Sequence, residues 1–504
     1  MTAYYVDAIG GNDGWAGTTP ATAWQTIAKL NGSAFNPGDS ILFKRGEAWA
    51  GTILTVSSSG LTGAPITFGA YGSGALPIIS GNDAAPRSIY CLARQHVDFE
   101  YLDARDATSY AIDIQSSHVE IRNCATSGCG DDNISIGPNA HDVLVKDVVS
   151  YDPYRGAIPQ TIACIEIQDG AYNVMLDNCE CYGSAEAGIN INAHEGETMP
   201  WNILLRRCHS HDNTNSGITI SNSGSLSAAP SITVDGCRSI NNGYMGVDIY
   251  NGGAGLDPPN VNLRHCVLDG NTSYQARISG DGHTYCQNVF SGRHGVLILD
   301  ATNLALCNNT IYNTEVGTVF AFTGTDNSGT VAKNNIVYVP IAANNVIFVA
   351  VGAQAGLDID YNLYHHVSGD GATRWNWNGA DYNWANWKTN SGQDANSPAP
   401  ADPLFANATL DDFTLKNGSP ALEAGVYVGL DYDGTAPNCG AYGVRSIPNA
   451  SAAKFKQKLE SPDLAVKLTT GEFMNPAQVR AATDAQLTAA SVTDSQLTWL
   501  REVY

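Results

Sequence analysis

The stretch GCRSINNGYMGVDIYNG, residues 236–252, contains a short segment in which the acid Asp248 stands between the aliphatic residues Val247 and Ile249. Alternation of apolar and polar residues is typical of a β-strand, and flanking Gly, Asn and Ser are typical of turns. The pattern returns at a fixed distance, because Thr219 in SGITIS stands as far before Asp248 as Arg277 in QARISG stands after it. The chain is therefore built from repeats.

A companion phrase recurs in the same register as VMLDNC, ILLRRC, ITVDGC and VNLRHC, which end at Cys179, Cys208, Cys237 and Cys266. Less regular copies extend the array in both directions, at residues 119–124, 143–148, 284–289, 304–309 and 331–336. A period of 20 to 50 residues is typical of a solenoid. Since each repeat supplies short strands joined by turns, and successive repeats stack as parallel neighbours about 4.8 Å apart, we expect an all-β fold, a parallel β-helix.

Four regions are expected along the chain. Residues 1–85 form an N-terminal segment whose phrase WQTIAKLN is a short helix that caps the open end of the coils, since an uncovered end would expose a strand edge. Residues 86–365 are the coils, and residues 366–449 are C-terminal coils with aromatic-rich loops. Residues 450–504 read as a short helical tail for capping, oligomerisation or attachment.

The composition limits the classes of partner. A net charge of −23 argues against nucleic acid and anionic membranes, and the absence of 18 consecutive apolar residues argues against membrane insertion. The start MTAYYVDAIGG lacks a secretory signal, so we expect either a trimmed extracellular protein or a virion tail component. Most of the twelve cysteines occupy one repeat position, which predicts a ladder of free, buried thiols.

The phrases YYVDAIGGNDGWAGTTPATAWQTIAKLN, PGDSILFKRG and SGQDANSPAPADPLFANATLDDFTLKNGSPALEAG, with the coils between them, resemble right-handed parallel β-helix proteins of the pectate-lyase-like superfamily over about residues 4–445. The resemblance implies a right-handed parallel β-helix with an N-terminal cap and a C-terminal non-repeat region. It also implies activity on polysaccharides, since the superfamily includes lyases, glycoside hydrolases, epimerases and phage tailspike depolymerases. The likeness to tailspikes implies a homotrimer attached to a virion tail.

The phrase GDDNISI, residues 130–136, is similar to the G-D-D segment of polygalacturonases. That resemblance implies acid and water-activating roles for Asp131 and Asp132. The N-T-D-G and G-H-G phrases of that family are not at the matching places, and the alternative is a turn in which Asp side chains bond their own backbone.

Alignment of the strands on their inward aliphatics gives two outward columns of polar residues. The first column holds Asp113, Ser135, Glu166, Asn190, Thr219, Asp248 and Arg277, and the second holds Gln115, Gly137, Gln168, Asn192, Ser221, Tyr250 and Ser279. Many hydrogen-bonding groups and one ring suit a glycan. We therefore expect substrate binding by Asn190, Asn192, Thr219, Ser221, Tyr250 and the loop residue His194, and catalysis by Asp113, Asp131, Asp132, Glu166, Asp248 and Arg277.

The spacing favours hydrolysis slightly over elimination. Asp113 and Glu166 lie two coils apart, about 10 Å between backbones, close to the carboxylate separation of ~6.5–9.5 Å in inverting glycosidases. Hydrolysis requires no cofactor. Elimination requires a base and a cation for a uronate carboxylate, for which the candidates are Arg277, Tyr250, His194 and His283, with calcium at Glu195 and Glu197 as an option.

An outward column on the other sheet, of Arg122, Lys146, Asp177, Arg206, Asp235 and Arg264, largely alternates in charge and is predicted to be a solvated ion ladder of little energetic value. Asp248 beside Arg277 is either the same device or part of the glycan site. The sequence predicts an extracellularly acting enzyme that degrades a uronate-containing capsular, exopolysaccharide or pectic glycan. The alternative is a non-catalytic glycan-binding tail or adhesion protein that uses the same polar face.

Overall fold

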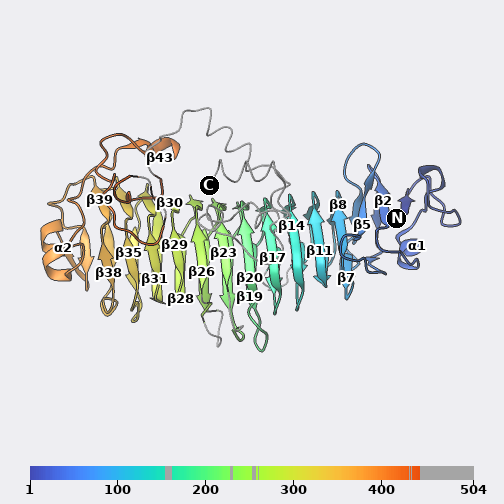
Figure 1. Cartoon of the computed structure of the whole chain (residues 1–504), viewed down its shortest axis with the longest axis horizontal. Coiled ribbons are helices and arrows are strands. Elements are labelled where there is room, and N and C mark those ends of the chain that lie inside the picture. Colours follow the sequence, from blue (N-terminus) through green and yellow to red (C-terminus); the bar gives the residue numbers. More distant parts are fainter. Residues whose placement is uncertain are drawn as a thin grey trace, which may run out of the picture. The chain divides into compact units, whose positions relative to one another are not determined.

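The computed structural model describes residues 1–442 except 154–161, 227–230, 252–256, 259, 431 and 433. Residues 1–444 form one compact unit, in which three long sheets of 14, 13 and 14 strands run side by side (Figure 1). Each coil contributes one strand to each sheet, and the coils stack in sequence order. The predicted all-β, right-handed parallel β-helix is confirmed. No helix among the described residues is long and apolar enough to cross a membrane.

Sheet 1 consists of β1 (Ala3–Val6), β2 (Ser40–Lys44), β5 (Ile66–Tyr71), β8 (Val97–Glu100), β11 (Ser117–Arg122), β14 (His141–Lys146), β17 (Tyr172–Asp177), β20 (Trp201–Arg206), β23 (Ile232–Asp235), β26 (Val261–Arg264), β29 (Thr284–Cys286), β32 (Ala305–Cys307), β35 (Val331–Lys333) and β38 (Asp358–Asp360). Sheet 2 consists of β3 (Ala48–Ala50), β6 (Ile78–Ser80), β9 (Asp103–Arg105), β12 (Ala125–Ser127), β15 (Val149–Tyr151), β18 (Glu180–Tyr182), β21 (His209–His211), β24 (Arg238–Ile240), β27 (Val267–Asp269), β30 (Val289–Gly292), β33 (Thr310–Asn313), β36 (Ile336–Val339) and β39 (Leu363–His366).

Sheet 3 consists of β4 (Leu54–Thr55), β7 (Arg87–Leu92), β10 (Tyr110–Gln115), β13 (Ile134–Ile136), β16 (Ala163–Gln168), β19 (Ala187–Ala193), β22 (Ile218–Asn222), β25 (Val247–Asn251), β28 (Tyr274–Asp281), β31 (His294–Thr302), β34 (Phe320–Thr323), β37 (Ile347–Val349), β40 (Trp375–Trp377) and β41 (Ala380–Tyr382). The last pair, β40 and β41, is antiparallel and ends the sheet. A separate antiparallel pair, β42 (Phe405–Asn407) and β43 (Asp412–Leu415), follows.

The core is a set of aliphatic ladders that run along the axis. In sheet 3, for example, Ile189 pairs with Ile218 and Ile218 pairs with Val247, and none of the three is more than 1% exposed. Each inward side chain rests on its counterpart in the next coil, so the core lengthens with every repeat.

A helix lies near each end of the coils (Figure 1). Helix α1 (Ile27–Asn31) begins after Thr26, whose hydroxyl accepts the backbone N–H of Lys29, and its residues Ile27 and Leu30 are buried in the core. The predicted short helix is therefore confirmed. Helix α2 (Trp384–Ser391) buries Trp384 and Trp387 against the other end.

The expected start of the coils at residue 86 is wrong. Strands β1 to β6, all within residues 3–80, already pair in the three sheets. The expected tail at 450–504 lies outside the described residues, so the trimer and the attachment to a virion tail stay predictions.

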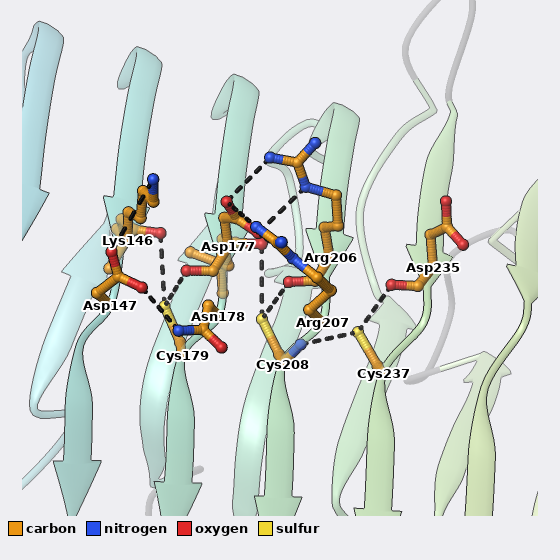
Figure 2. A network of polar contacts seen from close by, with 12 residues as sticks. Lys146, Asp147, Asp177, Asn178, Cys179, Arg206, Arg207, Cys208, Asp235 and Cys237 are labelled. Atoms are coloured by element: carbon orange, nitrogen blue, oxygen red, sulfur yellow. Dashed lines mark hydrogen bonds and ion pairs between the residues drawn. The ribbon is translucent and has the colours of Figure 1, made fainter. Parts of the chain in front are cut away.

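All twelve cysteines are free and buried, as expected. The corner between sheets 1 and 2 carries Cys179, Cys208 and Cys237 in successive coils, and the backbone N–H of Cys208 lies 3.4 Å from Sγ of Cys237 (Figure 2). Burial raises the pKa of the Cys179 and Cys237 thiols well above their usual range, which keeps them as thiols.

Asparagine replaces cysteine at this corner in the later coils. Asn288, Asn309, Asn335 and Asn362 form a ladder in which the backbone N–H of each residue donates to Oδ1 of the next. The backbone N–H of Asn362 donates to Oγ of Ser397 at 2.9 Å, which ends the ladder. Each corner is thus closed by a side chain from the following coil.

The charged column of sheet 1 is not a solvated ladder. The Asp177 side chain is fully buried and is bound by the guanidinium groups of Arg206 and Arg207 at 2.9 and 2.7 Å, and Lys146 is also buried (Figure 2). Hydrogen bonds and charge from both arginines outweigh burial and lower the pKa of Asp177. The Asp235–Arg264 pair, with side chains 24% and 43% exposed, does resemble the surface pair that the alternation predicts.

Candidate active site

The predicted outward column of sheet 3 is present in the expected register. Asp113 pairs with Ser135, Ser135 with Glu166, Glu166 with Asn190, Asn190 with Thr219, Thr219 with Asp248, and Asp248 with Arg277. The second column also holds, with Gln168, Asn192, Ser221 and Tyr250 as successive neighbours. These outward side chains are nevertheless buried, since Asp113, Glu166 and Asp248 are only 1%, 4% and 3% exposed.

A pair of carboxyl groups lies at one part of this column. Asp132, which precedes β13, forms a side-chain hydrogen bond with Glu166 on β16. Oδ1 of Asp132 also accepts the backbone N–H of Ala163 at 2.7 Å, and Oε1 of Glu166 accepts the side-chain amide of Asn190 at 3.0 Å. Hydrogen bonds from Ala163 and Asn190 therefore hold the two carboxyl groups in position.

The surroundings of Asp132 and Glu166 favour a shared proton, because the pKa of each group is raised. Burial, the charge of Glu166 and the hydrogen bond between the two groups raise the pKa of Asp132 well above its usual range. Burial also raises the pKa of Glu166, but the hydrogen bond from Asp132 opposes this shift. The raised pKa of Asp132 favours its protonated form, in which the O–H would donate to the carboxylate of Glu166. Two adjacent acids that share a proton are a common arrangement for acid–base chemistry.

Two further aspartates flank the pair. Asp131 is partly exposed and accepts a hydrogen bond from the hydroxyl of Tyr110; burial raises its pKa, while that bond opposes the shift. Asp113 is ion-paired with Arg87 and lies 3.4 Å from the side-chain amide of Gln115. Asp131 is the most accessible carboxyl of the group.

Amide oxygens beside the pair have no hydrogen-bond partner. Oδ1 of Asn190 and Oδ1 of Asn192 are buried and accept no bond from the described residues. A buried, unpaired acceptor costs about 1–3 kcal/mol, which a bound hydroxyl group or water would recover. These two atoms could accept hydrogen bonds from ligand hydroxyls, and the substrate-binding roles of Asn190 and Asn192 stay predictions.

The two histidines considered from sequence have different positions. His194 is exposed directly after β19, where its Nδ1 lies 3.0 Å from the carboxylate of Asp169. His283 is fully buried, and its Nδ1 accepts the backbone N–H of Val261 while its Nε2 lies 3.0 Å from the carbonyl oxygen of Ser279. His283 is thus a core residue and is excluded as a base.

Asp248 and Arg277 form a separate cluster. The guanidinium of Arg277 makes two hydrogen bonds to the carboxylate of Asp248, at 2.6 and 2.8 Å, and lies 4.8 Å from the ring centre of Tyr250. Three strand spacings, about 14 Å, separate Asp248 from Glu166. The structure therefore brings together Asp113, Asp131, Asp132 and Glu166, and places Asp248 and Arg277 further along the column, beyond Asn190 and Thr219.

Sequence reasoning missed Arg87 and Tyr110. Arg87 begins β7 in RSIYCL, and Tyr110 begins β10 in YAIDIQ, so both precede the aliphatic positions used for the alignment. Extension of the column by one coil toward the N-terminus would have reached Tyr90, which pairs with Asp113, and hence Arg87. Glu195 and Glu197, the calcium candidates, are exposed in the turn after β19.

The sequence matches the family described as right handed beta helix region over residues 87–262. A segment of 86 residues is 36% identical to a lacto-N-biosidase of Bifidobacterium longum, and this segment is 16% of the chain but only 5% of that protein.

Two solved structures share the fold. The pectate lyase Pel9A has a TM-score of 0.50 and 14% identity, with 88% of this chain and 96% of that chain covered. XylC in complex with xylose has a TM-score of 0.51 and 12% identity, with 72% and 84% covered. The predicted resemblance to right-handed parallel β-helix proteins is therefore confirmed at the level of the fold.

Proposed function

We propose that this right-handed parallel β-helix is a glycan-degrading enzyme, which hydrolyses a glycosidic bond at the Asp132–Glu166 pair. The proposal rests on the buried, hydrogen-bonded carboxyl pair of Asp132 and Glu166. Glu166 belongs to the first polar column of sheet 3, which continues over several strands. The likeness to part of a lacto-N-biosidase and the fold shared with a pectate lyase support action on carbohydrate.

Each carboxyl group receives a role from its environment. Asp132 donates its proton to the oxygen of the leaving sugar, and Glu166 orients that proton through their hydrogen bond. Asp131, accessible and held by Tyr110, accepts a proton from the water that attacks the anomeric carbon. Arg87 is ion-paired with Asp113 beside the site: burial raises the pKa of Asp113, and the hydrogen bond and charge of Arg87 oppose that shift. In its ionised form Asp113 would favour the positive sugar ring of the transition state.

The substrate that fits this column is a neutral stretch of glycan, rather than the uronate expected from sequence. Arg277 on the first polar column and Arg87 beside it are already paired with Asp248 and Asp113. A uronate carboxylate would meet Asp113 and Asp131 beside the carboxyl pair, and no unpaired cation among the described residues faces it there. Elimination needs a cation at the uronate carboxylate. For this reason we propose hydrolysis rather than elimination. Hydrolysis by carboxyl groups requires no metal, so calcium belongs to the elimination alternative.

The setting of the activity follows from the substrate. Capsules, exopolysaccharides and pectic polymers lie outside cells and are the material to test, so we propose that the enzyme acts extracellularly. Attachment to a virion tail as a trimer is a further proposal that rests on the resemblance to tailspikes alone.

Incubation with a panel of neutral and uronate-containing polysaccharides tests the proposal. We expect new reducing ends without the ultraviolet absorbance of unsaturated uronates. Asp132→Asn and Glu166→Gln should each reduce the rate by about 10²–10⁴-fold, the usual contribution of general acid–base catalysis. Asp235→Asn, on sheet 1, is the matched control and should retain the wild-type rate.

Three results would overturn the proposal. Unsaturated uronates would indicate elimination, and binding without cleavage would indicate an adhesin. Full activity in both Asp132→Asn and Glu166→Gln would place the chemistry elsewhere.

A further inference from the structure

A cluster of metal-ligand side chains lies on sheet 2, outside the polar columns of sheet 3. Glu180 on β18 pairs directly with His209 on β21, and His211 follows two positions later on the same face of β21. One ligand atom from each of these three residues lies within 4.8 Å of the others. Neighbouring coils thus present two imidazoles and a carboxylate to one point.

The hydrogen bonds of His211 fix which nitrogen carries its proton. Nδ1 lies 2.7 Å from the carboxylate of Asp212, which only accepts, so Nδ1 is the donor. In the neutral ring Nε2 then carries a lone pair, and it faces Oε1 of Glu180 at 3.2 Å. Two acceptors at that distance require either a second proton on His211 or a cation between them.

His209 distinguishes these two possibilities. Its Nε2 is buried and has no hydrogen-bond partner among the described residues. A second proton on His211 would leave this buried nitrogen unpaired. A cation would satisfy all three atoms at once.

We propose that Glu180, His209 and His211 bind a divalent transition metal of the zinc class. Two imidazoles and one carboxylate are a common zinc ligand set, and bonds of about 2.0–2.1 Å place tetrahedral ligands about 3.4 Å apart. The separation of Nε2 of His211 and Oε1 of Glu180, 3.2 Å, is close to this value, and a ring nitrogen of His209 lies within 4.8 Å of both ligand atoms. Asp212 is the carboxylate that orients a ligating histidine, and the ring of Tyr182, stacked at 5.1 Å, holds the other side of His211.

This site would join two coils and leave one coordination position for water. Arg238 pairs with His209 from the next strand, and its positive charge acts against cation binding. The Arg238 side chain is exposed, so solvent weakens that repulsion. The site is independent of the proposed hydrolysis, since it shares no residue with sheet 3.

Zinc binding to the chelator-treated full chain tests the proposal, measured by competition with a chromogenic chelator. We expect one zinc ion per chain. His209→Gln and Glu180→Gln should each weaken binding by about 100-fold or more, and Asp212→Asn by about 10–100-fold, as for other outer partners of a metal ligand. His265→Gln is the matched control, since His265 also lies 2.9 Å from a carboxylate, that of Asp235, and it should bind as wild type.

Cobalt binding supplies a second measurement, which separates this site from the buried thiols. The cobalt complex should show the visible bands of nitrogen and oxygen ligands and no thiolate charge-transfer band. Glu180 is 46% exposed, so Glu180→Gln should keep the fold, which circular dichroism would verify. Absence of zinc binding in wild type, wild-type affinity in both His209→Gln and Glu180→Gln, or a thiolate band would each overturn the inference.

Discussion

Replacement of Asp248 by Asn tests whether Asp248 and Arg277 behave as a buried ion pair or as a surface ion pair. The change keeps the shape of the side chain but removes the charge that faces Arg277, whose side chain is only 20% exposed while that of Asp248 is 5% exposed. A guanidinium would then remain largely buried without a counter-charge.

The expected loss can be worked from the contacts. Removal of one partner from a buried pair costs about 3–5 kcal/mol. The ring of Tyr250, 4.8 Å from the guanidinium carbon of Arg277, retains about 1 kcal/mol as a cation–π contact. We therefore expect Asp248→Asn to lower the free energy of unfolding by about 2–4 kcal/mol. Asp235→Asn, in the more exposed pair with Arg264, should cost about 0–1 kcal/mol.

Urea denaturation followed by circular dichroism measures both variants, as shifts of the midpoint at unchanged slope. The double variant Asp248→Asn with Arg277→Met should regain most of the loss, because no unpaired charge remains. A loss below about 1 kcal/mol for Asp248→Asn, or equal losses for Asp248→Asn and Asp235→Asn, would refute the reasoning. In activity assays Asp248→Asn should raise KM with little change in kcat, since Asp248 lies about 14 Å from the carboxyl pair.

Three other outcomes are expected. Thiol titration of the native protein should detect almost no reactive cysteine, and titration after denaturation should detect all twelve, because every cysteine is buried and free. The rate of hydrolysis should fall as pH rises through the raised pKa of Asp132, since the acid must be protonated, and Asp132→Asn should lose this limb of the pH profile. Burial lowers the pKa of His283 from 6.5 to about 4, so the unfolded chain takes up this proton first as pH falls. The contribution of His283 to the free energy of unfolding should therefore be complete above about pH 6.5 and fall by about 3 kcal/mol toward pH 4; urea denaturation of wild type and His283→Gln across this range checks the difference.

The repeat predicts correctly which residues pair between neighbouring coils, but it does not predict how deeply their side chains are buried. A constant spacing in the sequence predicts that Thr219, Asp248 and Arg277 lie side by side, and the structure pairs them in that order. Alternation also predicts that Asp248 faces outward, but it carries no information on what surrounds that face. The near-complete burial of Asp248 and of Asp177 on sheet 1 could not be predicted for this reason.

The carboxyl pair shows a second limit. Asp132 precedes its strand, so the alternation of side chains along β13 does not determine where its carboxyl group lies, and its contact with Glu166 depends on the path of the turn. The N-terminal coils show a third. Their paired strands are offset by unequal lengths of chain, as in Ala3 with Ser40, Ser40 with Thr67 and Thr67 with Asp98, so a search for one period does not find them.

The asparagine ladder has a consequence for synthesis of the chain on the ribosome. The backbone N–H of Asn309 donates to Oδ1 of Asn335, and that of Asn335 donates to Oδ1 of Asn362. The acceptor for each of these corners is therefore synthesised one coil later than the donor. While these coils are being synthesised, the backbone N–H at the last completed corner therefore lacks its acceptor from the protein. The hydroxyl of Ser397 supplies the final acceptor, so the later coils reach their full complement of hydrogen bonds only after translation has passed that residue.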